Sequence, residues 1–153
     1  MPGFGSVGLG PALIAPSATE KALGQGKWQL GVAPTVSFTR APHWTVGFTA
    51  RNYVSVAGAA DRPAVSQLLI EPSVTRTFAG GWFVGHSDFD WQVDWIDDQV
   101  TLPIGVQAGR VFTLGGYMLS LSFESAWVAV RPAGTDPWLG SIEATLFFYG
   151  FGQ

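Results

Sequence analysis

The feature that constrains this chain most is a regular alternation of apolar and polar side chains. From Trp28 to Phe38 apolar side chains occupy every second position, and the residues between them are polar or small. Because successive side chains of a β-strand point to opposite faces, this period of two predicts a strand with one apolar and one polar face. The pattern recurs along nearly the whole chain. The sequence therefore predicts a single all-β domain, residues 1–153.

Eight strands are expected, joined by connections of alternating length. We expect them at residues 4–16, 27–40, 43–57, 66–78, 82–91, 100–112, 117–130 and 138–151, with the weakest alternation in the fifth. Gly- and Pro-rich connections at 40–43, 79–81 and 113–116 predict tight turns. Longer polar segments at 17–26, 58–65, 92–99 and 131–137 predict loops. Short turns at one end and long loops at the other are typical of outer-membrane barrels, whose short turns are periplasmic.

Composition indicates what the apolar face contacts. Charged residues make up 12% of the chain and hydrophobic residues 47%, whereas soluble domains carry about 25% charged residues. No run of about 18 apolar residues exists, so a transmembrane helix is not expected. Apolar side chains at alternating positions instead indicate an antiparallel up-and-down transmembrane β-barrel. The alternative is a soluble lipocalin-like barrel that binds an apolar ligand inside, which would turn the apolar face inward.

Several function classes are not expected from this composition. The net charge is −3 without a basic patch, which argues against a nucleic-acid partner. Cysteine is absent and the two histidines, His43 and His86, are far apart, so neither a metal site nor a cofactor is expected. His86, Ser87 and Asp88 have the residue types of a hydrolase triad, but neighbours on a strand point to opposite faces, so we expect no enzyme. The acidic segment 88–98 lacks the spacing of a calcium loop and is expected to be a solvated extracellular loop.

The polar face is expected to line the lumen of the barrel. Its charged and amide residues are Arg51, Gln67, Glu71, Gln107, Glu124 and Glu143. Three carboxylates against one arginine would favour cations or neutral polar solutes if water fills the lumen. The interior of an eight-stranded barrel is just wide enough for side chains to fill. The alternative is therefore a closed lumen in which Arg51 pairs with one of the three glutamates.

Three arginines share the apolar face, and each lies beside a tight turn. These are Arg40, Arg76 and Arg110. A charge on the lipid face at mid-membrane would cost about 2–4 kcal/mol, but a long side chain near a strand end reaches the headgroups. Aromatic residues lie at the same level, as in the interfacial girdles of membrane proteins. The sequence thus predicts a membrane-interface belt composed of Arg40, Trp44, Arg76, Trp82, Arg110 and Tyr117.

Four stretches resemble a known family in their order and spacing. They are residues 17–31 (SATEKALGQGKWQLG), WTVG at 44–47 leading to VSVAG at 54–58, LPIGVQAGRVF at 102–112, and Arg131-Pro132 before Pro137-Trp138. Together they are similar to Gram-negative outer-membrane proteins often labelled neuromedin U or transporter. That family is related to the barrels of the meta-pathway of phenol degradation.

The resemblance implies a β-barrel in the bacterial outer membrane that passes small, often hydrophobic or aromatic, molecules. It implies outer-membrane lipid, a small-molecule solute and the barrel-insertion machinery as partners. Family members are longer, so it also implies that this chain is the C-terminal portion, with the signal peptide and N-terminal strands missing. A closed barrel with a structural or adhesion role remains the alternative to a transporter.

Overall fold

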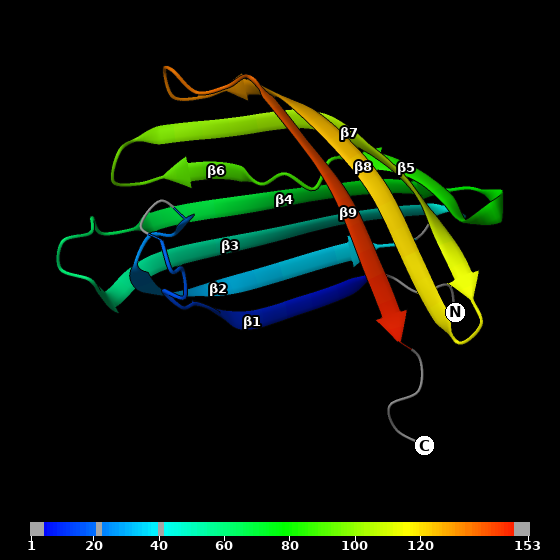
Figure 1. Ribbon diagram of the computed structural model, residues 1–153, viewed down its shortest axis with the longest axis horizontal. Helices are drawn as coiled ribbons and strands as arrows, with labels where there is room; N and C mark the ends of the chain where they lie inside the picture. Colours follow the sequence, from blue (N-terminus) through cyan, green and yellow to red (C-terminus); the bar gives the residue numbers. More distant parts are fainter. Residues whose placement is uncertain (1–4, 21–22, 40–41, 149–153) are drawn as a thin grey trace.

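The computed structural model describes residues 5–20, 23–39 and 42–148, which form one antiparallel sheet of nine strands (Figure 1). The strands are β1 (Ser6–Ile14), β2 (Lys27–Phe38), β3 (Trp44–Gly58), β4 (Ser66–Thr77), β5 (Trp82–His86), β6 (Trp91–Asp94), β7 (Gln99–Leu114), β8 (Tyr117–Val130) and β9 (Trp138–Phe148). A 3-10 turn, η2 (Ala79–Gly81), links β4 to β5. The all-β class expected from the sequence is confirmed. The predicted strand ends at residues 4, 40 and 149–151 lie outside the described residues.

Consecutive strands pair with each other, as expected for an up-and-down sheet, except that β5 and β6 do not pair. The order is β1-β2-β3-β4-β5-β7-β8-β9, and β6 continues the line of β5 between β4 and β7. The pairing path ends at β1 on one side and at β9 on the other. Within the described residues no ladder joins these two edges. The antiparallel sheet is therefore established as an open path of strands.

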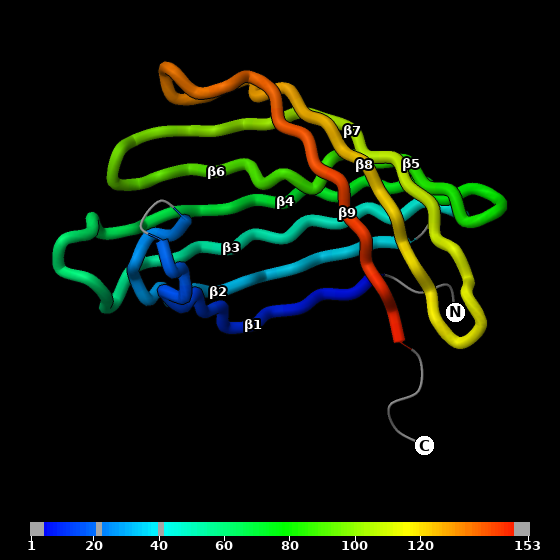
Figure 2. Tube along the Cα trace, viewed as in Figure 1, coloured from blue at the N-terminus to red at the C-terminus, as the bar shows by residue number. Residues whose placement is uncertain are grey.

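The sheet is strongly curled. In Figures 1 and 2 the strands β8 and β9 run across the direction of β1 to β4. Side chains on the polar face reach each other across an intervening strand: the Gln67 Nε2 on β4 donates to the Gln29 Oε1 on β2, at 3.5 Å. Such contacts require curvature toward that face, so we call it the inner face and the apolar one the outer face.

Exposure is inverted relative to a soluble sheet. On β2 the outer side chain of Val32 is 55% exposed, whereas the neighbouring inner side chain of Gln29 is fully buried. Gln67 and Gln107 are also buried on the inner face, and Tyr53 is buried beside them. The apolar side chains of the outer face are thus exposed, and the polar side chains of the inner face are the more buried ones.

The fifth predicted strand is interrupted, which corrects the single strand expected at 82–91. Residues 87–90 separate β5 from β6, and β6 extends to Asp94, inside the segment predicted as the loop 92–99. The remaining connection is short. The Asp94 Oδ1 accepts hydrogen bonds from the backbone N–H groups of Ile96 (2.8 Å) and Asp97 (3.1 Å), which closes the turn.

The interruption is a β-bulge of one extra residue. Gly85 pairs with Thr75 and Trp91 pairs with Ile70, so five residues (86–90) lie opposite four (71–74). An extra residue shifts the phase of every side chain that follows it. The alternation therefore fails in this stretch of the sequence, although the strands on either side are regular.

Candidate functional site: the polar inner face

The inner face holds an ion-pair triad centred on Arg51. Its Nη2 lies 2.8 Å from the Glu71 Oε2 and 2.6 Å from the Asp90 Oδ1. Arg51 is on β3, Glu71 on β4 and Asp90 in the bulge beyond β4, so the triad spans three neighbouring chain segments. A pair of Arg51 with a glutamate was one of the alternatives expected from the sequence, whereas the contact with Asp90 was not.

A second cluster brings the predicted residues Gln107 and Glu124 together with Asp88. The Gln107 Nε2 donates to the Asp88 Oδ1 and to the His86 carbonyl oxygen, both at 2.8 Å. The Asp88 backbone N–H donates to the Glu124 Oε2 at 2.8 Å, and the Ser141 hydroxyl donates to the other oxygen of that carboxylate at 3.0 Å. The cluster therefore ties the bulge to β7, β8 and β9.

Amide side chains occupy the end of the inner face nearest the long loops. Gln67 accepts a hydrogen bond from the Gln92 Nε2 at 3.3 Å and donates to Gln29. The Gln29 Nε2 in turn donates to the Gln25 Oε1 at 2.5 Å. The chain of amides satisfies buried polar groups without adding charge. Gln67 was predicted to lie on this face, and the structure bonds it to two further glutamines, Gln29 and Gln92.

Glu143 stands apart from the two clusters. It lies on the edge strand β9, opposite Ser122, and is exposed. One of its carboxylate oxygens accepts a hydrogen bond from the Thr145 hydroxyl at 2.5 Å. Its place on the inner face agrees with the expectation, but the structure does not bring it into contact with Arg51.

The sequence assigned Asp88 and Asp90 to a solvated acidic loop, 88–98. The structure places both in the bulge between β5 and β6, where Asp88 is exposed and Asp90 is half-buried. The bulge turns both toward the inner face, where Asp90 pairs with Arg51 and Asp88 with Gln107. A signal was present in the sequence. Apolar residues occupy even positions before the interruption, at Trp82, and odd positions after it, at Trp91.

The inner face is acidic as a whole. Six of its carboxylates lie in the described residues: Glu71, Asp88, Asp90, Asp94, Glu124 and Glu143. Arg51 offsets part of this charge, and Lys27, at the loop end, donates to the Ala59 carbonyl oxygen at 2.8 Å. Among the described residues no group of three or more His, Asp or Glu side chains is arranged to hold a metal ion.

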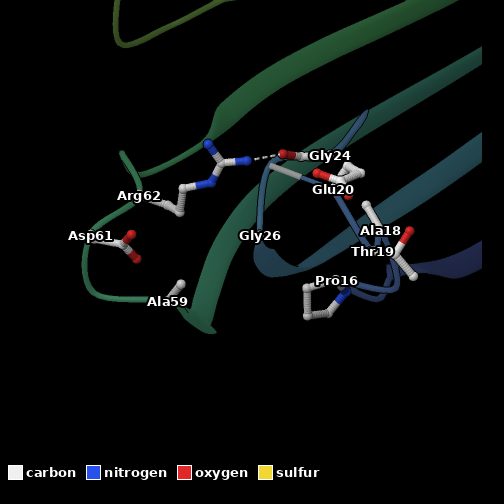
Figure 3. Close-up of a pocket in the computed structure, with 9 residues that line it drawn as sticks. All are labelled: Pro16, Ala18, Thr19, Glu20, Gly24, Gly26, Ala59, Asp61 and Arg62. Carbon is white, nitrogen blue, oxygen red and sulfur yellow. Dashed lines mark hydrogen bonds between the residues drawn. The ribbon is translucent and has the colours of Figure 1, made fainter. Parts of the chain in front are cut away.

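A small cavity of about 140 Å³ lies between two loops at the long-loop end (Figure 3). Arg62 reaches across from the loop between β3 and β4, and its guanidinium donates to the Gly24 carbonyl oxygen. Glu20 and Thr19 line the other side. The contact links the two loops.

The residues of the predicted belt gather at the tight-turn end of the outer face. The Arg76 guanidinium carbon lies 5.5 Å from the ring centroid of Trp44, and that of Arg110 lies 5.3 Å from the ring centroid of Trp82. Tyr117 packs edge-on against Phe148, with ring centroids 5.5 Å apart. Arg40 lies outside the described residues. The structure thus brings the other belt residues into aromatic contacts at one level of the sheet.

One polar residue breaks the apolar pattern of the outer face. Asn52 on β3 accepts a hydrogen bond at its Oδ1 from the Trp95 indole N–H, at 3.2 Å. The partner comes from the turn after β6, near the long-loop end. The amide is therefore satisfied locally by an aromatic side chain.

The comparisons with known proteins returned no match: no family model, curated protein or solved structure is similar to this chain. Separately, no helix in the described part of the chain has the length and apolarity needed to cross a membrane.

Proposed function

We propose that this chain supplies eight membrane crossings of an outer-membrane β-barrel of the transporter or porin type, through which small molecules pass passively. The observation that carries the proposal is the inverted exposure of the sheet, with Val, Leu, Phe and Trp side chains uncovered on the outer face. Soluble monomers rarely expose apolar patches larger than a few hundred Å². Lipid is the environment in which such a surface is stable, and all backbone groups are satisfied there once the sheet closes.

The connectivity supports a membrane-crossing topology. Because β5 and β6 lie end to end between the same neighbours, the nine strands make eight crossings, and the first and last run antiparallel. Short turns join β2 to β3, β4 to β5 and β7 to β8 at one end, where the belt residues also lie. This end would face the periplasm, as short turns do in outer-membrane barrels.

The inner face supplies the pathway in this proposal. Its surplus of carboxylates over basic groups favours cations and neutral polar solutes. The resemblance to the phenol-degradation family adds small hydrophobic or aromatic compounds to the candidate solutes. The inner-face side chains are hydrogen-bonded to one another, which gives the pathway a fixed polar wall.

A closed structural or adhesion barrel is the second candidate. It is favoured by the ion-pair triad of Arg51 and by the buried glutamines, since an eight-stranded interior is narrow enough for such side chains to fill. The soluble, lipocalin-like candidate is disfavoured. It needs the apolar side chains inside, and they lie outside.

The first experiment is refolding in detergent followed by detergent removal. We expect far-UV circular dichroism of a β-sheet in detergent micelles or lipid vesicles, and aggregation when the detergent is removed. A folded, monodisperse protein in detergent-free buffer would contradict the membrane proposal.

Conductance in planar bilayers then separates a pore from a closed barrel. A pore lined by this inner face should be cation-selective, with a reversal potential in a salt gradient that shifts toward zero in Glu124→Gln, because one wall charge is removed. Asp136→Asn, in the loop 131–137, is the matched control and should leave selectivity unchanged. Absence of conductance in well-inserted protein would favour the closed barrel.

A further inference from the structure

A shallow groove of about 420 Å³ crosses the outer face near its tight-turn end. Its walls are formed by Val74 of β4, Val84 of β5 and Val106 of β7, so the groove extends across three strands. Trp44 and Phe78 border it at the tight-turn end. Nearly all of the lining is apolar, so the groove suits a chain that neither donates nor accepts hydrogen bonds.

The one charged residue of the groove lies at that same end. The Arg76 guanidinium carbon is 5.5 Å from the ring centroid of Trp44 and 5.0 Å from that of Phe78. Within the described residues, no carboxylate and no hydrogen-bond acceptor contacts this guanidinium. Its planar donors are held in place by two rings and are free to bind an anion.

Neither of two nearby polar residues competes with Arg76 for that role. The His86 ring, at the other end of the groove, contacts the Ser87 carbonyl oxygen through its Nδ1 at 2.7 Å and packs edge-on against Trp91. Arg110 lies at the same level of the sheet but outside the groove, and its Nε donates to the Gly80 carbonyl oxygen at 3.0 Å. The groove is therefore apolar along its length and cationic at one end.

We propose that this groove binds one anionic phospholipid, with an acyl chain along the valines and the phosphate on Arg76. The inference rests on the proposed membrane location of the outer face. A lipid is the ligand whose shape matches both halves of the site, since its chain makes no hydrogen bonds and its phosphate lies at the level of an interfacial belt. Guanidinium binds phosphate through paired N–H donors, which would fix the lipid at this position rather than in the general lipid shell.

The test is native mass spectrometry of the folded protein in detergent, titrated with phosphatidylglycerol. The wild-type chain should retain one lipid at concentrations where further adducts are weak. Arg76→Gln should weaken that retention about tenfold or more, because a charge-assisted hydrogen bond is lost. Arg110→Gln is the matched control, a belt arginine outside the groove that also lies over two aromatic rings, and should retain the lipid as the wild type does.

Further measurements test separately what the acyl chain and the phosphate headgroup contribute to lipid binding. Val84→Trp, which fills the groove and leaves Arg76 in place, should also reduce retention. Diacylglycerol with the same acyl chains and free glycerophosphate should each bind more weakly than the intact lipid. Glycerophosphate binding as tight as that of the lipid would overturn the proposal in favour of a simple phosphate site.

The same samples also show which part of the argument fails if the lipid is not bound as expected. Equal retention in Arg76→Gln and Arg110→Gln, with both folded by circular dichroism, would overturn the lipid site and leave the membrane proposal standing. Displacement of the lipid by a second copy of the chain, seen as a dimer lost in Arg76→Gln, would show that the groove is an interface between copies. Failure to remain folded in detergent or vesicles would count against the proposed function itself.

Discussion

At the scale of single residues, charge on the inner face is organised around Arg51. It contacts two carboxylates, while Asp88 and Glu124 interact with neutral donors, from the Gln107 amide, the Ser141 hydroxyl and the backbone. One guanidinium therefore holds β3, β4 and the bulge together. The remaining carboxylates keep the face acidic.

Replacement of Arg51 by Gln should destabilise the folded protein. Glu71 and Asp90 would lose their shared partner and repel each other. The three side chains are 27–31% exposed, so the loss of unfolding free energy should be about 1–3 kcal/mol rather than the larger cost of a fully buried pair. Urea unfolding in lipid vesicles, followed by tryptophan fluorescence, measures this change.

A double-mutant cycle provides the control for that prediction. Glu71→Gln in the Arg51→Gln background should cost less than it does in the wild type, because the partner is already absent. Strict additivity of the two substitutions would mean that the ion pair does not form in the folded protein.

At the scale of elements, the bulge between β5 and β6 decides which side chains face inward. It lets Asp88 and Asp90 share the inner face with Gln92, and it places Trp82 and Trp91 together on the outer face. The sequence predicted one continuous strand because an alternation with a single phase change is hard to distinguish from an irregular one. The extra residue became visible only when the partners of both halves were known.

Two single-residue deletions within the bulge test the assignment of inner and outer positions, because both remove the extra residue but only one turns a carboxylate outward. Removing Asp88 leaves four residues opposite four, with Phe89 facing outward and Asp90 still inward, so the protein should fold. Removing Phe89 restores the same count but turns Asp88 toward the outer face, where a carboxylate in lipid is costly. We expect a lower refolding yield in vesicles for the Phe89 deletion than for the Asp88 deletion. Equal yields would contradict the assignment of inner and outer positions.

At the scale of the whole molecule, the pairing of the edge strands β1 and β9 decides how wide the enclosed interior is. Both edges have apolar outer faces, and most of their inner-face residues are small or polar, so both are suited to continue a membrane sheet. An interior enclosed by eight crossings alone is filled by side chains, whereas passage of solutes needs a wider bore. The proposed transporter function therefore predicts that the two edges do not pair directly with each other.

Cysteine cross-linking tests this directly, since the native chain has no cysteine. Leu9→Cys on β1 can be combined in turn with Ile142→Cys, Ala144→Cys and Leu146→Cys on β9, all on the outer face. For a transporter we expect no intramolecular disulfide in folded, membrane-inserted protein from any combination. An efficient intramolecular bond would show direct closure and favour the closed barrel. Leu13→Cys with Leu30→Cys, which lie directly opposite each other on the neighbouring pair β1–β2, is the positive control for oxidation.

The sequence by itself determined the all-β class, the strand positions apart from the fifth and the two faces of the sheet, because a strand period of two is a local property of the backbone. It also placed Arg51, Gln67, Glu71, Gln107, Glu124 and Glu143 on one face. Only the tertiary structure decided that Asp88 and Asp90 join them, that Arg51 pairs with Glu71 and Asp90 rather than with Glu124 or Glu143, and that Arg76 ends an apolar groove. These depend on register, on the bulge and on curvature, which arise from pairing between distant strands and leave no regular period in the chain.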